Sequence, residues 1–422
     1  MSFEHRPSSR EREIAECVQN LKNPNPRLRS QAAEDLGKLG AFEAVPELVE
    51  QLQTDVNTYV RSASAEALGR IGDSQAIFPL MDALRDPCSF VRRAAAIALG
   101  QMQAKEAQGA LLRALEDPNF YVRRAAINAI GKLEIPDLAP RLSPFLETPD
   151  PRIRRTAIIA LSRLGSREAV PAMAALLETY LVSPNQRDLP VVKTLVTALG
   201  DLRAREAVPV LTEVLRGYVG ARSLTAATLG AIGDDSAGPA LVEALHDDGS
   251  RNLQLAALKS LSRLNYRPAI PEVRRFLDAP DPRLRRTAAL TLGALGDVDA
   301  TPRLLKMAQQ DESPLVRPAA VEALGQLGDR RVLGALLPLI DDGNAYLRAA
   351  LAHALSTLDG DTPEVRQALL QLRNDKVRHV ALAAERALAR CPSALETEST
   401  KVQGHSKREH RHRSWLRRFL GR

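Results

Sequence analysis

The sequence predicts an all-α protein, an α-solenoid of about eleven stacked helix pairs followed by a basic C-terminal tail. One observation is composition: 45% of the 422 residues are hydrophobic but only 4% are aromatic. The apolar residues are mostly alanine and leucine, which favours closely packed helices over β-sheets. A second observation is a motif that recurs along almost the whole chain. One helix pair cannot bury its apolar face alone, so recurring pairs must stack on their neighbours.

The motif is anchored on an arginine that usually follows an aliphatic residue. This arginine recurs at Arg29, Arg61, Arg92, Arg123, Arg154, Arg222, Arg285, Arg317 and Arg348, and two degenerate copies carry Val192 and Gln254 instead. Most successive anchors are 30 to 32 positions apart, and the exception is the 38 positions from Arg154 to Val192. Spacing this regular identifies a repeat array.

Each repeat predicts two helices. The first begins at a proline such as Pro46, because the first helical turn does not need a backbone N–H. A turn such as Asp86-Pro87 breaks the chain before the second helix, and a glycine such as Gly72 ends that helix. The second helix places apolar residues on one face at helical spacing, for example Val91, Ala95, Ala98, Leu99 and Met102.

These repeats resemble HEAT repeats, specifically the short variety of the phycobilisome (PBS) lyase HEAT-like repeat family, over residues 11–391. The resemblance implies a right-handed superhelix whose groove holds a protein partner. Phycobilin lyases of this family attach, isomerise or remove linear tetrapyrroles on light-harvesting proteins. The resemblance therefore also implies a photosynthetic bacterium as the setting, and a bilin as the ligand if the activity carries over.

The expected domain organisation has four parts. Residues 1–10 form a disordered N-terminus, residues 11–391 the solenoid, residues 392–400 a linker and residues 401–422 the tail. The segment VSPNQRDLP (182–190) interrupts the sixth repeat between its two helices and divides the array into five and six repeats. This insertion is either a contact loop or a tolerated drift in sequence.

The tail carries the excess positive charge. Residues 401–422 contain eight Lys/Arg and one Glu, which equals the net charge of +7 for the whole chain, so residues 1–400 are neutral overall. A basic amphipathic segment suits an anionic membrane surface, and an acidic protein partner is the alternative. The candidate contact residues are Arg413, Trp415, Leu416, Arg417, Arg418, Phe419 and Leu420.

The residue that follows the anchor arginine suggests a partner-binding stripe. It varies between repeats, so packing does not dictate it, and it is basic in four consecutive repeats: Arg93, Arg124, Arg155 and Lys193. Ile97, Asn128 and Ile159 lie on the same helix faces, and the helices begin near Tyr59, Phe90 and Tyr121. Aromatic, arginine and exposed aliphatic residues are enriched at binding hot spots. The alternative is a solvated face whose aromatic residues fill the seams between repeats.

The anchor arginine itself is expected to be structural. An aspartate usually precedes it by six positions, as Asp86 precedes Arg92, so the two residue types can form a ladder along the stack. The direction opposite the buried helix face is expected to pass through Arg93, Ala96 and Ile97.

Known catalytic and metal-binding motifs are missing from the sequence. We therefore expect no catalytic residues, no metal and no cofactor, other than a bilin if the lyase activity carries over. Three scattered cysteines, no signal peptide and no long apolar run predict a cytoplasmic protein, placed at the inner or thylakoid membrane if the tail binds lipid. The neutral body makes nucleic acid an unlikely partner.

The function predicted from these observations is a non-enzymatic scaffold or adaptor that holds a protein partner in the solenoid groove. The alternative is a phycobilin lyase, or a chaperone associated with one, that acts on phycobiliproteins. The sequence leaves the identity of the partner and the oligomeric state open.

Overall fold

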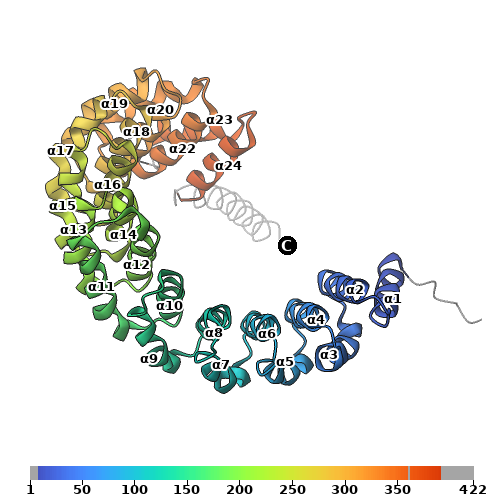
Figure 1. Ribbon diagram of the computed structural model, residues 1–422. Coiled ribbons are helices and arrows are strands. Elements are labelled where there is room, and N and C mark those ends of the chain that lie inside the picture. The colour runs from blue at the N-terminus through green and yellow to red at the C-terminus, as the bar shows by residue number, and fades with distance from the viewer. Residues whose placement is uncertain (1–7, 360–361, 391–422) are drawn as a thin grey trace, which may run out of the picture. The chain divides into compact units, whose positions relative to one another are not determined.

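The computed structural model describes residues 8–359 and 362–390, and within these ranges the regular structure is entirely helical. The chain divides into an N-terminal block, residues 1–228, and a C-terminal block, residues 229–422. Each block is a stack of helix pairs, which confirms the predicted α-solenoid (Figure 1).

The helices of the N-terminal block are α1 (Ser9–Asn20), α2 (Pro26–Leu39), α3 (Val45–Thr54), α4 (Thr58–Ile71), α5 (Ile77–Ala83), α6 (Ser89–Gln101), α7 (Gln108–Ala114), α8 (Phe120–Lys132), α9 (Ala139–Leu142), α10 (Pro151–Arg163), α11 (Val170–Val182), α12 (Leu189–Asp201) and α13 (Val208–Gly217). The next helix, α14 (Arg222–Ile232), contains the boundary between the blocks. Short 3-10 turns such as η1 (Phe42–Ala44) precede most odd-numbered helices.

The helices of the C-terminal block continue the same alternation. They are α15 (Gly238–Glu243), α16 (Arg251–Arg263), α17 (Ile270–Arg275), α18 (Pro282–Leu295), α19 (Thr301–Gln310), α20 (Val316–Leu327), α21 (Leu333–Leu336), α22 (Ala345–Asp359), α23 (Pro363–Arg373) and α24 (Arg378–Ala389).

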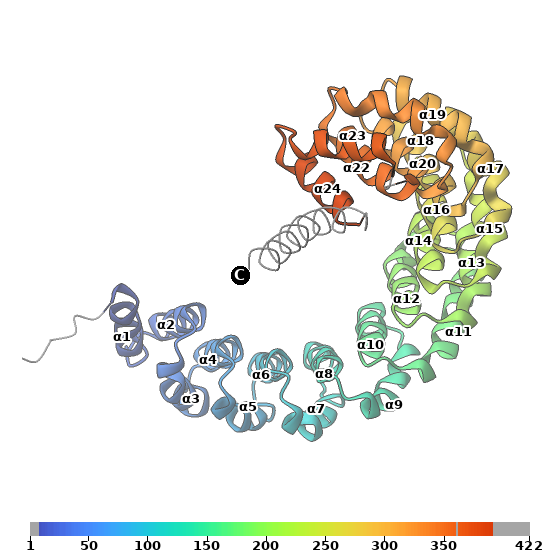
Figure 2. The ribbon, with the colours of Figure 1, turned by 180° about the vertical axis from the view of Figure 1, so that it is seen from behind.

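Even-numbered and odd-numbered helices form two separate rows in the N-terminal block. Helices α2, α4, α6, α8, α10 and α12 follow one another on the concave side and are called the inner row, while α3, α5, α7 and α9 lie on the convex side (Figures 1 and 2). Each inner-row helix packs against its odd-numbered partner and against the inner-row helices before and after it. The inner row therefore offers only a narrow strip of each helix to solvent.

Small residues bring the inner-row helices close together. A Cβ atom added at Gly69 on α4 would lie 2.6 Å from the Cα of Ala98 on α6, so only glycine permits this backbone approach. The same pairing recurs between Gly100 and Ala129. These close contacts lie in the row of helices that forms the concave side of the block.

The predicted helix boundaries agree with the structure. Pro46 lies in the first turn of α3, the side chain of Asn57 caps α4, and Gly72 ends α4 in the left-handed conformation with φ of 78°. The first helix begins earlier than predicted: Ser9 and Arg10 are helical, because Ser8 and Glu11 form a reciprocal capping box.

The described residues contain a twelfth helix pair, α23 and α24, in addition to the eleven that the anchors define. The anchor position of α24 is occupied by Ala381, which conceals the repeat, although Asp375 keeps the aspartate six positions before it. The insertion at 182–190 forms an exposed connection around η7 (Gln186–Asp188), and the hydroxyl of Tyr218 donates to the carbonyl of Asn185 at 2.7 Å.

Candidate partner-binding site

The anchor arginines form a structural ladder, as expected, but six of the nine pair with the aspartate of the following repeat rather than with that of their own. Arg92 donates from Nε and Nη2 to the carboxylate of Asp117 at 2.7 and 3.0 Å, and from Nη1 to the backbone carbonyl of Asp86 at 2.8 Å. The same pairing joins Arg29 to Asp55, Arg61 to Asp86, Arg285 to Asp311, Arg317 to Asp342 and Arg348 to Asp375. These arginines are therefore part of the stack rather than part of a binding surface.

The residues of the predicted stripe lie on four consecutive helices of the inner row. Arg93 and Ile97 lie on α6, Arg124 and Asn128 on α8, Arg155 and Ile159 on α10, and Lys193 on α12, and all of them are partly or fully exposed. The expectation that Ala96 faces solvent is wrong, since Ala96 is completely buried. Inner-row helices are covered on both flanks, which leaves a narrower exposed strip than a helix packed on one side would have.

The aromatic residues of the stripe do not fill seams between repeats. Tyr59, Phe90 and Tyr121 are 71%, 55% and 48% exposed, each at the start of an inner-row helix. The guanidinium of Arg93 lies 5.9 Å from the ring centroid of Phe90, and that of Arg124 lies 5.7 Å from the ring of Tyr121. Such cation–π contacts hold an arginine in place beside an exposed ring.

Two further residues belong to this aromatic group and are missing from the sequence-based prediction. Phe120 precedes Tyr121 at the start of α8, and the guanidinium of Arg152 on α10 lies 4.4 Å from its ring centroid. The sequence does contain a signal for Arg152. It lies two residues before the anchor of its repeat, the position that Tyr59, Phe90 and Tyr121 occupy in theirs.

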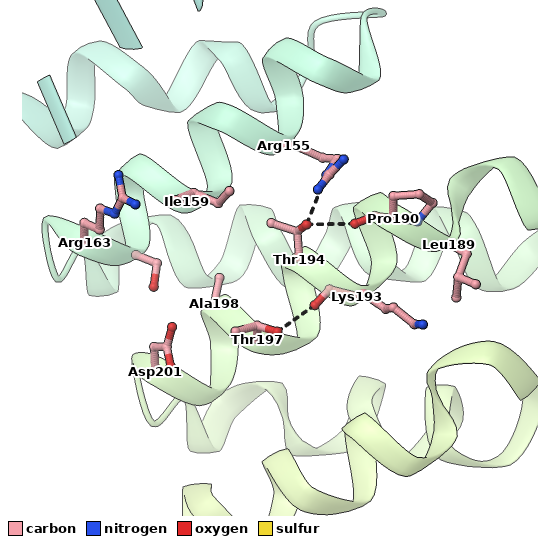
Figure 3. A pocket seen from close by; sticks show the side chains of 11 residues that line it. Arg155, Ile159, Arg163, Leu189, Pro190, Lys193, Thr194, Thr197, Ala198 and Asp201 are labelled. Atoms are coloured by element: carbon pink, nitrogen blue, oxygen red, sulfur yellow. Dashed lines mark hydrogen bonds between the residues drawn. The ribbon is translucent and has the colours of Figure 1, made fainter. Parts of the chain in front are cut away.

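A cavity of about 590 Å³ lies between α10 and α12, and three of the predicted residues, Arg155, Ile159 and Lys193, line it. Figure 3 shows Ile159 between Arg155 and Arg163 along α10. Arg155 donates to the hydroxyl of Thr194 at 3.3 Å, and Arg163 donates to the side chain of Asn128 at 3.0 Å. Arg155, Arg163 and Lys193 line the cavity together with one acidic residue, Asp201. None of the three basic groups has a carboxylate within 4.0 Å among the described residues, so the lining carries a net positive charge that favours an anion.

A second cavity, of about 700 Å³, lies across α2, α4 and α6, and Tyr59, Phe90 and Arg93 line part of it. Its other walls include Arg27, together with the acidic Glu34 and Glu66. The remaining predicted residues, Ile97, Tyr121, Arg124 and Asn128, lie on the two helices α6 and α8. The structure thus brings all ten predicted residues to one side of the N-terminal block.

The inner row is far more basic than the neutral average of residues 1–400 suggests. Helices α6, α8 and α10 contain nine Lys/Arg residues and not one Asp or Glu. Acidic residues lie on the odd-numbered helices and in the turns, for example Glu47 on α3 and Glu178 on α11, and within the inner row they are confined to α2, α4 and α12. The block therefore has a basic concave side, which averaging over the whole sequence conceals.

The predicted tail residues, Arg413 to Leu420, lie outside the described residues, as do the linker and Cys391. No described helix is long and apolar enough to cross a membrane. Within residues 8–359 and 362–390, no three or more His, Cys, Asp or Glu side chains are grouped as metal ligands would be.

Comparison with known families confirms the repeat type. The HEAT-repeat family matches residues 14–100, 45–119, 107–183, 238–324 and 301–389, and the PBS lyase HEAT-like repeat matches residues 221–247. The chain belongs to the HEAT-repeat proteins. Within that class, it carries the PBS lyase HEAT-like repeat.

Several curated relatives carry names connected with bilins. A phycocyanobilin lyase subunit alpha of Picosynechococcus sp. is 30% identical over 164 residues, which cover 35% of this chain and 61% of the relative. The same subunit of Nostoc sp. is 30% identical over 192 residues, covering 41% of this chain and 69% of the relative. A bilin biosynthesis protein PecE of Nostoc sp. is 39% identical over 75 residues, covering 18% of this chain and 30% of the relative. The match to the first relative thus spans less than two thirds of its length.

Solved structures share the fold at low sequence identity. A crystal structure of importin beta superposes with a TM-score of 0.60 at 15% identity, over 91% of this chain and 64% of that chain. At this identity the likeness shows the fold alone.

Proposed function

We propose that this chain is a phycobilin lyase-type binding protein that holds a subunit of a bilin-binding light-harvesting protein on the inner row of its N-terminal block. The observation that carries the proposal is the basic concave side formed by α6, α8 and α10, with exposed aromatic residues where its helices begin. The similarity to phycocyanobilin lyase subunits supports this partner class over an unrelated one.

The cavity between α10 and α12 suits the bilin itself. Ile159, Leu189 and Ala198 give it an apolar wall, while three basic residues, Arg155, Arg163 and Lys193, outnumber the one acidic residue, Asp201, in its lining. A linear tetrapyrrole combines an apolar conjugated body with carboxylate side chains, and arginine binds carboxylates through paired hydrogen bonds. The cytoplasmic location, and a membrane contact through the tail, stay predictions.

The test compares binding of purified phycocyanin apo-subunit by the wild type and by Arg93→Glu/Arg124→Glu/Arg155→Glu, measured by biolayer interferometry. Reversing three charges on the binding side is expected to weaken binding at least ~10-fold, since each 1.4 kcal/mol lost is tenfold. The matched control is Arg85→Glu/Arg113→Glu/Arg141→Glu, which reverses three exposed arginines on or beside the odd-numbered helices α5, α7 and α9. The control is expected to bind as the wild type does.

Equal weakening by the two triple variants would show that only net charge matters and would contradict a site on the inner row. Absence of any binding by the wild type would contradict the proposed partner. Incubation with phycocyanobilin and the apo-subunit, followed by a denaturing gel, then separates the two roles: bilin that stays on the subunit indicates lyase activity, and bilin that is lost indicates holding alone.

A further inference from the structure

The Arg–Asp ladder is interrupted in the N-terminal block. At this gap, between Arg123 and Thr148, the arginine is present but the aspartate is replaced by threonine. In the three preceding repeats, Arg29, Arg61 and Arg92 each present Nε and Nη2 as a fork to the next aspartate. The side chains of these aspartates are only 4–10% exposed. Bidentate pairing of this kind fixes both the position and the direction of the guanidinium.

The guanidinium of Arg123 is positioned by the same backbone contacts as those of the earlier arginines, but it has no aspartate to bind. Its Nη1 donates to the backbone carbonyls of Asp117 and Pro118 at 2.8 and 3.0 Å, matching the contacts that Arg92 makes with its own turn. The place of the next aspartate, 25 positions further on, is occupied by Thr148. Among the described residues, no carboxylate lies within 4.0 Å of Arg123.

The next arginine of the series also lacks an anionic partner. Arg154 donates from Nη1 to the hydroxyl of Tyr180, which stands where an aspartate would be, and from Nη2 to the carbonyl of Thr148 at 2.6 Å. The Nε of Arg154 is buried and has no hydrogen-bond partner. Two adjacent guanidinium groups, at Arg123 and Arg154, therefore make no ion pair within 4.0 Å among the described residues.

The surroundings of the gap are accessible and suited to a protein segment. Arg123 and Thr148 are partly exposed, and Pro118 and Pro149 beside them are exposed. Phe120, Tyr121 and Arg152 lie at the starts of the two helices that flank the gap, α8 and α10. These two helices contain seven Lys/Arg residues and no acidic residue, so the local charge favours an acidic ligand.

We propose that the fork of Arg123, next to Thr148, is a binding site for a carboxylate of an acidic segment in a protein partner. The incoming Asp or Glu takes the position that Asp55, Asp86 and Asp117 take in the earlier repeats. The proposal rests on the proposed function only in that a protein partner approaches this side of the block. It deepens that function by naming the chemistry of the contact.

Completing the ladder with an internal carboxylate tests the site. Thr148→Asp supplies the missing acid from within the chain, and the probe is fluorescein-labelled poly-L-glutamate, followed by fluorescence anisotropy. We expect Thr148→Asp to bind the probe at least ~5-fold more weakly than the wild type, because the internal aspartate occupies the fork. The same variant is expected to raise the melting temperature by about 2 °C, as a new internal ion pair would.

Two control variants separate this effect from others. Thr148→Asn has a similar shape without the charge, and Ser89→Asp adds one negative charge at the start of α6, where Arg92 is already paired. Both are expected to bind the probe within about 2-fold of the wild type. Binding by Thr148→Asp that equals the wild type overturns the proposal, as does equal weakening by Ser89→Asp or the absence of probe binding by the wild type.

Failure here and failure of the proposed function are distinguishable. If the wild type binds phycocyanin apo-subunit but Thr148→Asp binds poly-L-glutamate normally, only the Arg123 site is wrong. If Thr148→Asp loses probe binding while no phycocyanin apo-subunit binds, the site stands and the partner class is wrong.

Discussion

Asp86 accepts hydrogen bonds from two different repeats at once. The guanidinium of Arg61, in the preceding repeat, donates to it at 2.7 and 2.9 Å, and the backbone N–H of Cys88, in its own turn, donates at 2.7 Å. The side chains of Asp86 and Arg61 are only 10% and 12% exposed. Each such aspartate therefore fixes its own turn and joins it to the repeat before.

Replacing Asp86 by alanine should destabilise the protein by about 2–3 kcal/mol, because Arg61 loses its partner in a mostly buried place. Urea unfolding measures the loss. The control is Asp82→Ala on α5, an exposed aspartate, for which a change below about 0.5 kcal/mol is expected. Similar values for the two variants would show that the ladder contributes nothing beyond an ordinary surface charge.

Acid should weaken the ladder. Burial alone would raise the pKa of Asp86, but hydrogen bonds from Arg61 and Cys88 and the positive charges of Arg61 and Arg92 hold its pKa below the ordinary value of 3.8. The pKa values of Asp55, Asp117, Asp342 and Asp375 are lowered in the same way.

Since these pKa values are lower in the folded than in the unfolded chain, the stabilisation is complete above the ordinary value and is lost as the pH falls through the lowered values. The free energy of unfolding should therefore fall between about pH 5 and pH 2, and fall less for Asp86→Ala than for the wild type. An identical pH dependence in the two proteins would contradict a role for Asp86.

At the residue scale, the sequence identified the positions of the ladder residues, but it did not identify which of them form ion pairs with each other. The register placed Arg92 and Asp86 in one ladder, yet it could not show that Arg92 reaches Asp117, since that depends on how the repeats stack. The expectation for Ala96 was wrong because a helical wheel treats a helix as covered on one side only. The contact between Phe120 and Arg152 was missed because it joins two helices.

At the scale of the helices, close approach within the inner row depends on glycine and alanine in register. Gly69→Ala places a methyl group 2.6 Å from the Cα and Cβ of Ala98, so α4 and α6 must move apart. We expect a loss of about 1–3 kcal/mol, as for other overpacked cores, measured by urea unfolding.

The matched variant is Gly109→Ala on α7, where the nearest atom to an added Cβ is the Nη1 of Arg113 at 3.9 Å. It should be neutral or stabilise by up to about 1 kcal/mol, because alanine favours the helix more than glycine does. If Gly69→Ala were as stable as Gly109→Ala, close packing of the inner row would not be what sets its spacing.

The helices themselves were largely predictable. Prolines and C-terminal glycines are local signals, and they placed the start of α3 and the end of α4 correctly. The twelfth pair escaped because Ala381 replaces the anchor arginine of α24, although Asp375 marks the repeat. A repeat search based on the anchor arginine misses the last repeat, because no further described repeat follows α24 with an aspartate for that arginine to bind.

At the scale of the whole molecule, stability is spread over contacts between neighbouring repeats, since helix packing joins each pair mainly to the next. A local defect should therefore stay local. In Asp86→Ala, hydrogen exchange measured by mass spectrometry should become faster in α4, α6 and α8 and stay unchanged in α18, α20 and α22. Faster exchange throughout both blocks would indicate a single cooperative structure instead.

At this scale, the net charge of the sequence gave no indication of how charge is distributed over the folded protein. Equal numbers of acidic and basic residues before position 401 suggested a neutral body, but the fold sorts them, with nine basic and no acidic residues on α6, α8 and α10. Only the alternation of inner and outer helices reveals this sorting. For the same reason, the partner-binding stripe could be located from the sequence, whereas the two cavities that it lines could not.

The two-sided bonding of the ladder aspartates makes the repeats interchangeable building blocks. A copy of residues 86–116 inserted before Asp117 would bring an aspartate to meet the existing Arg92 and a new arginine to meet Asp117. Lengthening the array by duplication there would leave no ion pair unmade. The same operation before Thr148, with a copy of residues 117–147, would give the existing Arg123 an aspartate and leave the new arginine beside Thr148. The array can therefore grow at either joint, and the arginine beside Thr148 that lacks a carboxylate would only move one repeat along.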